Sequence, residues 1–67
     1  MLTNIEKAII RILQILKIKN DTIIGIMLLL KENSKAQNKL LEFMKQSDPN
    51  DLNEQILLTK VLDLTNN

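Results

Sequence analysis

The sequence contains no cysteine, histidine, tryptophan or tyrosine, and it has only one phenylalanine, one glycine and one proline. Without cysteine no disulfide can form, and without cysteine or histidine the chain lacks the usual ligands of a structural zinc site. A single glycine excludes a glycine-rich phosphate loop. General acid–base or nucleophilic chemistry would depend on carboxylates, lysines or hydroxyls. We therefore expect no catalytic residue, no metal site and no cofactor, and we predict that the protein is not an enzyme.

The chain is also short, and it has no long hydrophobic run. The 67 residues predict one small helical domain, residues 1–67, and a chain of this size buries only about 60% of the surface that it exposes when unfolded. The longest apolar run is far shorter than the roughly 20 residues needed to span a membrane, and polar residues interrupt the N-terminal stretch, unlike a signal peptide. The lack of cysteine is compatible with a reducing compartment. We expect a cytoplasmic protein, and the heavy use of Ile, Lys and Asn suggests a bacterial or phage source.

What the sequence does have is apolar residues, 45% of the total, and their densest segment is residues 23–30, Ile-Ile-Gly-Ile-Met-Leu-Leu-Leu. Such a run is compatible with a buried strand or a buried helix. Its flanks favour a helix, because Asn20 and Asp21 are N-cap candidates and Asn33 can adopt the conformation that ends a helix. We predict a helix over residues 22–32, central in the fold and buried on all sides.

Capping signals place the preceding and following helices. Thr3 and Glu6 form a T-x-x-E capping box, which predicts a helix over residues 4–18. Ser34 and Gln37 form a similar S-x-x-Q box, which predicts a helix over residues 35–46.

A fourth helix is predicted over residues 50–64, because Pro49 bars helical geometry in the residue before it and is well suited to a first helical turn. Asp48 is the expected N-cap, and Asp51 with Glu54 as its box partner is the alternative. We interpret these three carboxylates as complements to the helix dipole in preference to a Mg²⁺ or Ca²⁺ site. The fold class is therefore all-α, a small compact bundle of four short helices.

Two single residues have expected structural roles. Gly25 costs its helix roughly 1 kcal/mol relative to alanine, so we expect another backbone to approach closely there, with contact to a ligand as the less favoured explanation. Phe43, with Met44 beside it, is expected to fill the core, not to build a cofactor pocket.

Some apolar residues fall outside the expected core stripes, and they suggest a binding surface. They are Ile10, Ile18, Leu52 and Ile56. Exposed apolar clusters on small proteins usually mark partner sites. The preferred hypothesis is a non-catalytic, possibly regulatory protein that acts through protein–protein contacts, either as a homo-oligomer, with a dimer favoured, or with another protein.

The alternative hypothesis is a small DNA-binding regulator. Residues 22–46 resemble the outline of a helix-turn-helix unit, in which the third helix would present Lys35, Asn38 and Lys39 to nucleic acid. The turn lacks the glycine often found there. The net charge is only +1, and residues 47–67 carry one lysine against four acids, whereas small nucleic-acid-binding domains are usually strongly basic. The charge balance thus favours protein contacts.

Overall fold

The computed structural model describes residues 1–66, and within them it contains four α-helices and no β-strand. The helices are α1 (Asn4–Ile15), α2 (Asn20–Leu30), α3 (Ser34–Gln46) and α4 (Glu54–Thr65), and a short 3₁₀ turn, η1 (Pro49–Asp51), precedes α4. The predicted class, an all-α bundle of four short helices, is confirmed.

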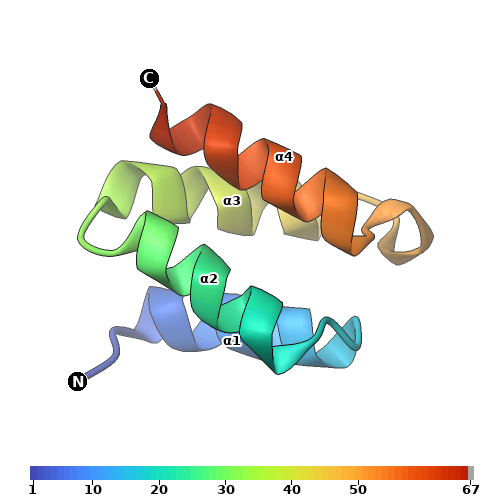
Figure 1. Ribbon diagram of the computed structural model, residues 1–67, viewed down its shortest axis with the longest axis horizontal. Helices are drawn as coiled ribbons and strands as arrows, with labels where there is room; N and C mark the ends of the chain where they lie inside the picture. Colours follow the sequence, from blue (N-terminus) through green and yellow to red (C-terminus); the bar gives the residue numbers. More distant parts are fainter. Residues whose placement is uncertain (67) are drawn as a thin grey trace.

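The helices form two layers (Figure 1). The α2 and α4 helices lie side by side in the layer nearest the viewer, and α1 and α3 form the layer behind them; α3 also packs on α4, and α1 on α2. None of these helices is long and apolar enough to cross a membrane. The side chains between the layers form one hydrophobic core, made of Ile9, Leu13, Ile18, Ile23, Ile26, Leu30, Ala36, Leu40, Met44, Leu52, Leu57 and Val61.

The first helix begins as predicted and ends earlier. The backbone N–H of Thr3 donates to Glu6 Oε1 at 2.8 Å, and the N–H of Glu6 donates to Thr3 Oγ1 at 3.1 Å, so the capping box is confirmed. The helix stops at Ile15, three residues before the predicted end, because Lys17 adopts φ 62°, a left-handed conformation that no α-helix contains. The chain then turns Ile18 into the core.

The α2 helix begins at Asn20, two residues earlier than predicted. Lys19 occupies the N-cap without a side-chain bond, and Asn20 and Asp21 lie inside the helix. The helix ends at Leu30, two residues earlier than predicted, because Lys31 takes φ 24°.

The third helix uses another cap than the one predicted. Asn33 Oδ1 accepts the N–H of Ala36 at 3.0 Å, so Asn33 begins α3 and does not end α2. The side chain of Gln37 donates to the carbonyl of Lys31. The predicted Ser34–Gln37 capping box is therefore wrong, and Gln37 instead satisfies a carbonyl at the end of α2.

Both predicted starts of α4 are wrong. Asp48 does cap a turn, since its Oδ1 accepts the N–H of Asn50 at 2.9 Å, but this turn is η1. The chain then turns Leu52 into the core, and Asn53 caps α4 by accepting the N–H of Ile56 at 2.9 Å. The anchoring of Leu52 separates the proline turn from the helix.

The α2 helix contacts the three other helices, but the prediction that it is buried on all sides is wrong. Ile23, Ile26 and Leu30 are buried, whereas Ile24, Leu28 and Leu29 are 57%, 62% and 43% exposed. A helix without polar residues is usually enclosed. In a bundle this small its neighbours cover only one side, so α2 presents an apolar surface outward.

Candidate protein interface

The outer side of α2 carries a stripe with a regular spacing. Asp21, Ile24 and Leu28 are exposed, and their spacings of three and four residues place them on one side of the helix. The exposed Lys31 follows three residues later, at the C-cap. The stripe thus has a carboxylate at one end followed by two large aliphatic side chains, and the amine of Lys31 lies just beyond its other end, outside the regular helix.

An apolar groove of about 510 Å³ runs beside this stripe, between α2 and α4. It is lined by Asp21, Thr22, Gly25, Leu28, Leu29 and Leu58. One turn beyond Leu58 on α4, Leu62 is 46% exposed. The stripe and the groove together are named the α2/α4 face, which consists of Asp21, Ile24, Gly25, Leu28, Leu29, Lys31, Leu58 and Leu62.

Gly25 does not have the predicted backbone neighbour. No atom lies within 4 Å of the position that a Cβ would occupy there, so nothing in this chain requires a glycine at that point. Its backbone instead forms part of the wall of the groove. The missing side chain leaves open space on the outside of the protein.

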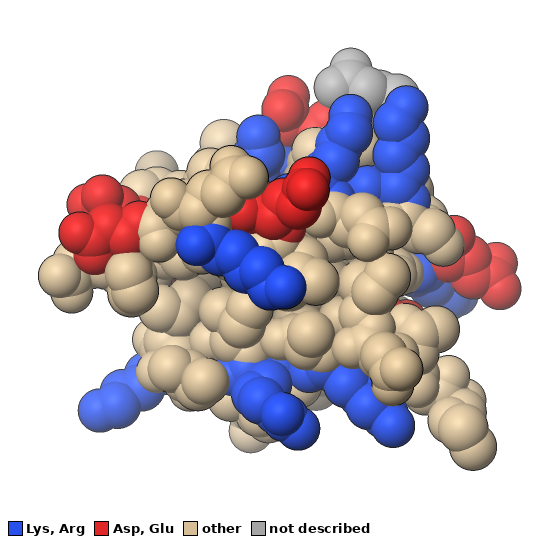
Figure 2. Space-filling model, turned by 180° about the vertical axis from the view of Figure 1, so that it is seen from behind, with Lys and Arg blue, Asp and Glu red and all other residues tan. Residues whose placement is uncertain are grey.

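The outer sides of the other helices are mostly polar, although Ile15 at the end of α1 is 71% exposed and Ile56 and Leu62 of α4 are 40% and 46% exposed. Lys7 and Arg11 are exposed on α1, Asn38 and Glu42 on α3, and Thr59 on α4. Figure 2, which views the molecule from the side opposite to Figure 1, shows Lys and Arg side chains along its lower edge and around its upper part. The outer side of α2 differs from them in carrying three exposed large aliphatic residues, Ile24, Leu28 and Leu29, where an ordinary solvated helix face carries charged and polar residues.

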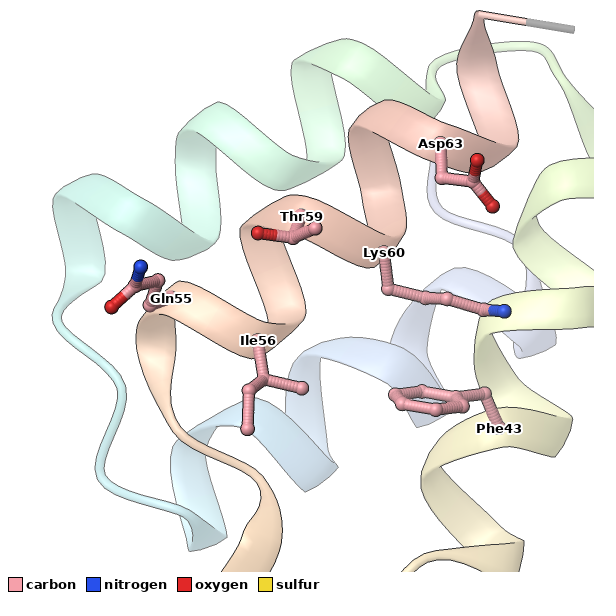
Figure 3. A pocket seen from close by; sticks show the side chains of 6 residues that line it. All are labelled: Phe43, Gln55, Ile56, Thr59, Lys60 and Asp63. Atoms are coloured by element: carbon pink, nitrogen blue, oxygen red, sulfur yellow. The ribbon is translucent and has the colours of Figure 1, made fainter.

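A second hollow, of about 420 Å³, lies on the other side of α4, next to α3. Figure 3 shows Ile56 and the Phe43 ring on the same side of α4, with Lys60 reaching over the ring. The Lys60 Nζ lies 5.0 Å from the ring centroid, within the range of a cation–π contact. Asp63 also lines this hollow. It is therefore more charged than the α2/α4 groove.

Only part of the predicted interface is exposed. Ile56 is 40% exposed and Ile10 is half-buried, but Ile18 and Leu52 belong to the core. The last two were misassigned because both lie outside the helices, where helical periodicity does not determine the direction of a side chain.

The sequence reasoning also missed residues that the structure exposes, namely Ile15 at the end of α1 and the α2 residues Ile24, Leu28 and Leu29. A segment of apolar residues alone has no polar side to mark the direction of solvent. The sequence did contain one indication of the exposed side. The charged residues Asp21 and Lys31 flank the apolar segment, and they are spaced three residues from Ile24 and from Leu28.

The residues proposed for nucleic-acid contact are all exposed on α3. Lys35 and Lys39 lie one turn apart, and the exposed Glu42 follows. The Asn38 side chain donates to the carbonyl of Ser34 at 2.9 Å, so one of its donors is already used within the helix. The face combines two lysines with a carboxylate, which is a weak electrostatic match to a phosphate backbone.

The chemistry of a functional site in this protein has to be inferred from its own residues. Comparison with known proteins finds no matching family model, no matching curated protein and no matching solved structure.

Proposed function

We propose that this protein is a non-catalytic binding module that acts through protein–protein contacts made by its α2/α4 face. The observation that supports the proposal is that Ile24 and Leu28 are each more than half exposed, on a helix whose Ile23, Ile26 and Leu30 belong to the core. Contiguous exposed apolar surface on a small protein usually marks an interaction site.

The free energy that burial of this surface could supply is large for such a small chain. Full burial of a leucine or isoleucine side chain contributes roughly 1.5 to 3 kcal/mol, so a partner that covers the exposed half of each would gain about 1 kcal/mol per residue. Four aliphatic residues of the face are about half exposed, namely Ile24, Leu28, Leu29 and Leu62. A chain below about 70 residues has only a few kcal/mol of net stability. Binding of a partner would use this apolar surface, which the fold itself leaves unburied.

The composition of the face favours a protein over the other classes of ligand. Small-molecule pockets combine apolar walls with several converging polar groups, whereas the groove has polar side chains only at Asp21 and Thr22, near its end. Nucleic acid requires lysines or arginines against its phosphates, and Lys31 alone contributes a positive charge to the face. The α2/α4 face has aliphatic side chains at its centre and a charged residue at each end of α2. This arrangement matches the general anatomy of a protein interface, which has an apolar centre and a polar rim.

A photo-crosslinking amino acid tests this proposal directly. It is introduced at Leu28 in the full chain, in cells that express the protein, and at the exposed Gln14 of α1 as the matched control. We expect irradiation to give a discrete protein adduct from position 28 and none from position 14. If neither position yields an adduct, or if both yield the same diffuse background, the proposed function is wrong.

A further inference from the structure

We infer that the partner which covers the α2/α4 face is a second copy of this chain, with the two α2 helices antiparallel across a two-fold axis level with Ile26. The inference rests on the proposed function and identifies its partner. It follows from the charge pattern and the register of the outer stripe, and from the open space at Gly25.

The outer side of α2 can pair with an antiparallel copy of itself, because its residues are placed symmetrically about position 26. Ile24 and Leu28 lie two residues before and after position 26, and Asp21 and Lys31 lie five residues before and after it. A two-fold axis at this level therefore places Ile24 across from the second copy's Leu28, and it brings Asp21 level with the second copy's Lys31 at the end of the helix. Because a two-fold axis generates each contact twice, the pair of helices gains two aliphatic contacts flanked by two ion pairs.

The charges select the antiparallel orientation. In a parallel pair Asp21 would face the second copy's Asp21, and Lys31 would face the second copy's Lys31, and such like-charge contacts are unfavourable.

The open space at Gly25 has a use in this arrangement. Gly25 lines the groove together with Leu28, so it lies on the side of the stripe that faces α4, within the length of helix that the second copy would cover. No atom of its own chain comes within 4 Å of a Cβ placed there, and the groove that it lines is about 510 Å³ in volume. A helix can approach another most closely at a glycine, which accounts for a residue that weakens α2 without serving the fold.

The size of the face is adequate for a specific dimer. A small but stable interface buries about 600 Å² on each partner, which is about an eighth of the 4819 Å² surface of this protein. The outer sides of two adjacent helices in a four-helix bundle present an area of that order. Hydrophobic contacts at the centre and charged pairs at the rim are the usual composition of such an interface.

Charge reversal with rescue tests the arrangement. The dimer dissociation constant is measured by sedimentation equilibrium for the full chain, for Asp21→Lys, for Lys31→Glu and for the variant carrying both changes. We expect each single variant to weaken the dimer by about tenfold, because two attractive pairs become repulsive, and the double variant to recover the original constant. Lys7→Glu, which makes the same charge change on the exposed side of α1, should leave the constant unchanged.

The outcomes separate this inference from the proposed function. A wild-type chain that stays monomeric up to about 1 mM, the weak end of measurable affinities, overturns the inference, even if position 28 crosslinks to another protein and the proposed function stands. A dimer that the single reversals do not weaken, or that the double variant does not restore, also overturns it. Circular dichroism of each variant establishes that the helices are intact, and the double variant keeps the net charge of the wild type.

Discussion

The Thr22 hydroxyl donates a 2.7 Å hydrogen bond to Glu54 Oε1 and thereby joins the first turn of α2 to the first turn of α4, across 32 residues of sequence. Both side chains are half-buried. The bond fixes the two helices at the end of the groove where Asp21 lies. The fold and the candidate interface are thus connected at one contact, because the same pair of helices forms both.

Replacing Thr22 by valine should lower the free energy of unfolding by about 1 kcal/mol. The substitution keeps the shape of the side chain and removes a hydrogen bond to a carboxylate, a loss of roughly 0.5 to 3 kcal/mol in partly buried sites. Urea unfolding measures the change. The control is Thr59→Val, the same substitution at an exposed threonine of α4, which should change stability by less than about 0.5 kcal/mol. Equal effects at the two positions would contradict a specific role for the Thr22–Glu54 bond.

Two substitutions on α2 should separate core from surface. Ile26 is fully buried and Leu28 is 62% exposed. At protein concentrations low enough to keep the chain monomeric, Ile26→Ala should cost about 2 to 5 kcal/mol, whereas Leu28→Ala should cost less than about 1 kcal/mol because little buried surface is lost. Thermal unfolding followed by circular dichroism distinguishes the two. A comparable loss at Leu28 would mean that its side chain belongs to the core.

Gly25→Ala should affect folding and association in opposite directions. Alanine has the better helix propensity by about 1 kcal/mol, and its methyl group meets no atom of the chain, so the monomer should become more stable by up to that amount. In the proposed dimer the same methyl group would project toward the second copy and should weaken association. Unfolding at low concentration and sedimentation at high concentration measure the two effects. A dimer strengthened in parallel with the monomer would show that the interface lies elsewhere.

The helices themselves could be predicted because their signals are local. The Thr3–Glu6 capping box is fully specified by residues three apart, and the structure forms both of its hydrogen bonds. The starts of α3 and α4 were harder, because several polar residues compete for each cap, and Asn33 and Asn53 displace the candidates beside them. Neighbouring alternatives of similar energy cannot be ranked without the tertiary contacts that follow.

The candidate site was harder to predict than the fold. Ile18 and Leu52 are stray apolar residues in the sequence, yet both are anchored in the core by turns that sequence periodicity does not describe. Conversely, residues 23–30 contain only apolar side chains, so nothing in the segment shows that Ile24 and Leu28 point outward. Which side of α2 is covered depends on how its three neighbours pack, and this is a property of the whole chain.

The exposed lysines of α3 should bind nucleic acid only weakly. At about 50 mM salt we expect duplex DNA to bind no better than roughly 10⁻⁴ M, the weak limit of non-specific contact, because Glu42 interrupts the basic face formed by Lys35 and Lys39. Fluorescence anisotropy with a labelled duplex measures the affinity. Submicromolar binding that Lys35→Ala with Lys39→Ala abolishes in a folded protein would instead favour the DNA-binding regulator.

The most direct measurement of the central claim is a dilution series followed by two-dimensional amide NMR. If the α2/α4 face binds a second copy, lowering the concentration should shift the amide resonances of Ile24, Gly25 and Leu28, together with those of Leu58 and Leu62. The amide resonances of exposed α1 residues such as Arg11 should not move. The change should follow a single monomer–dimer equilibrium. Spectra that do not depend on concentration, or shifts confined to α1 and α3, would contradict the account.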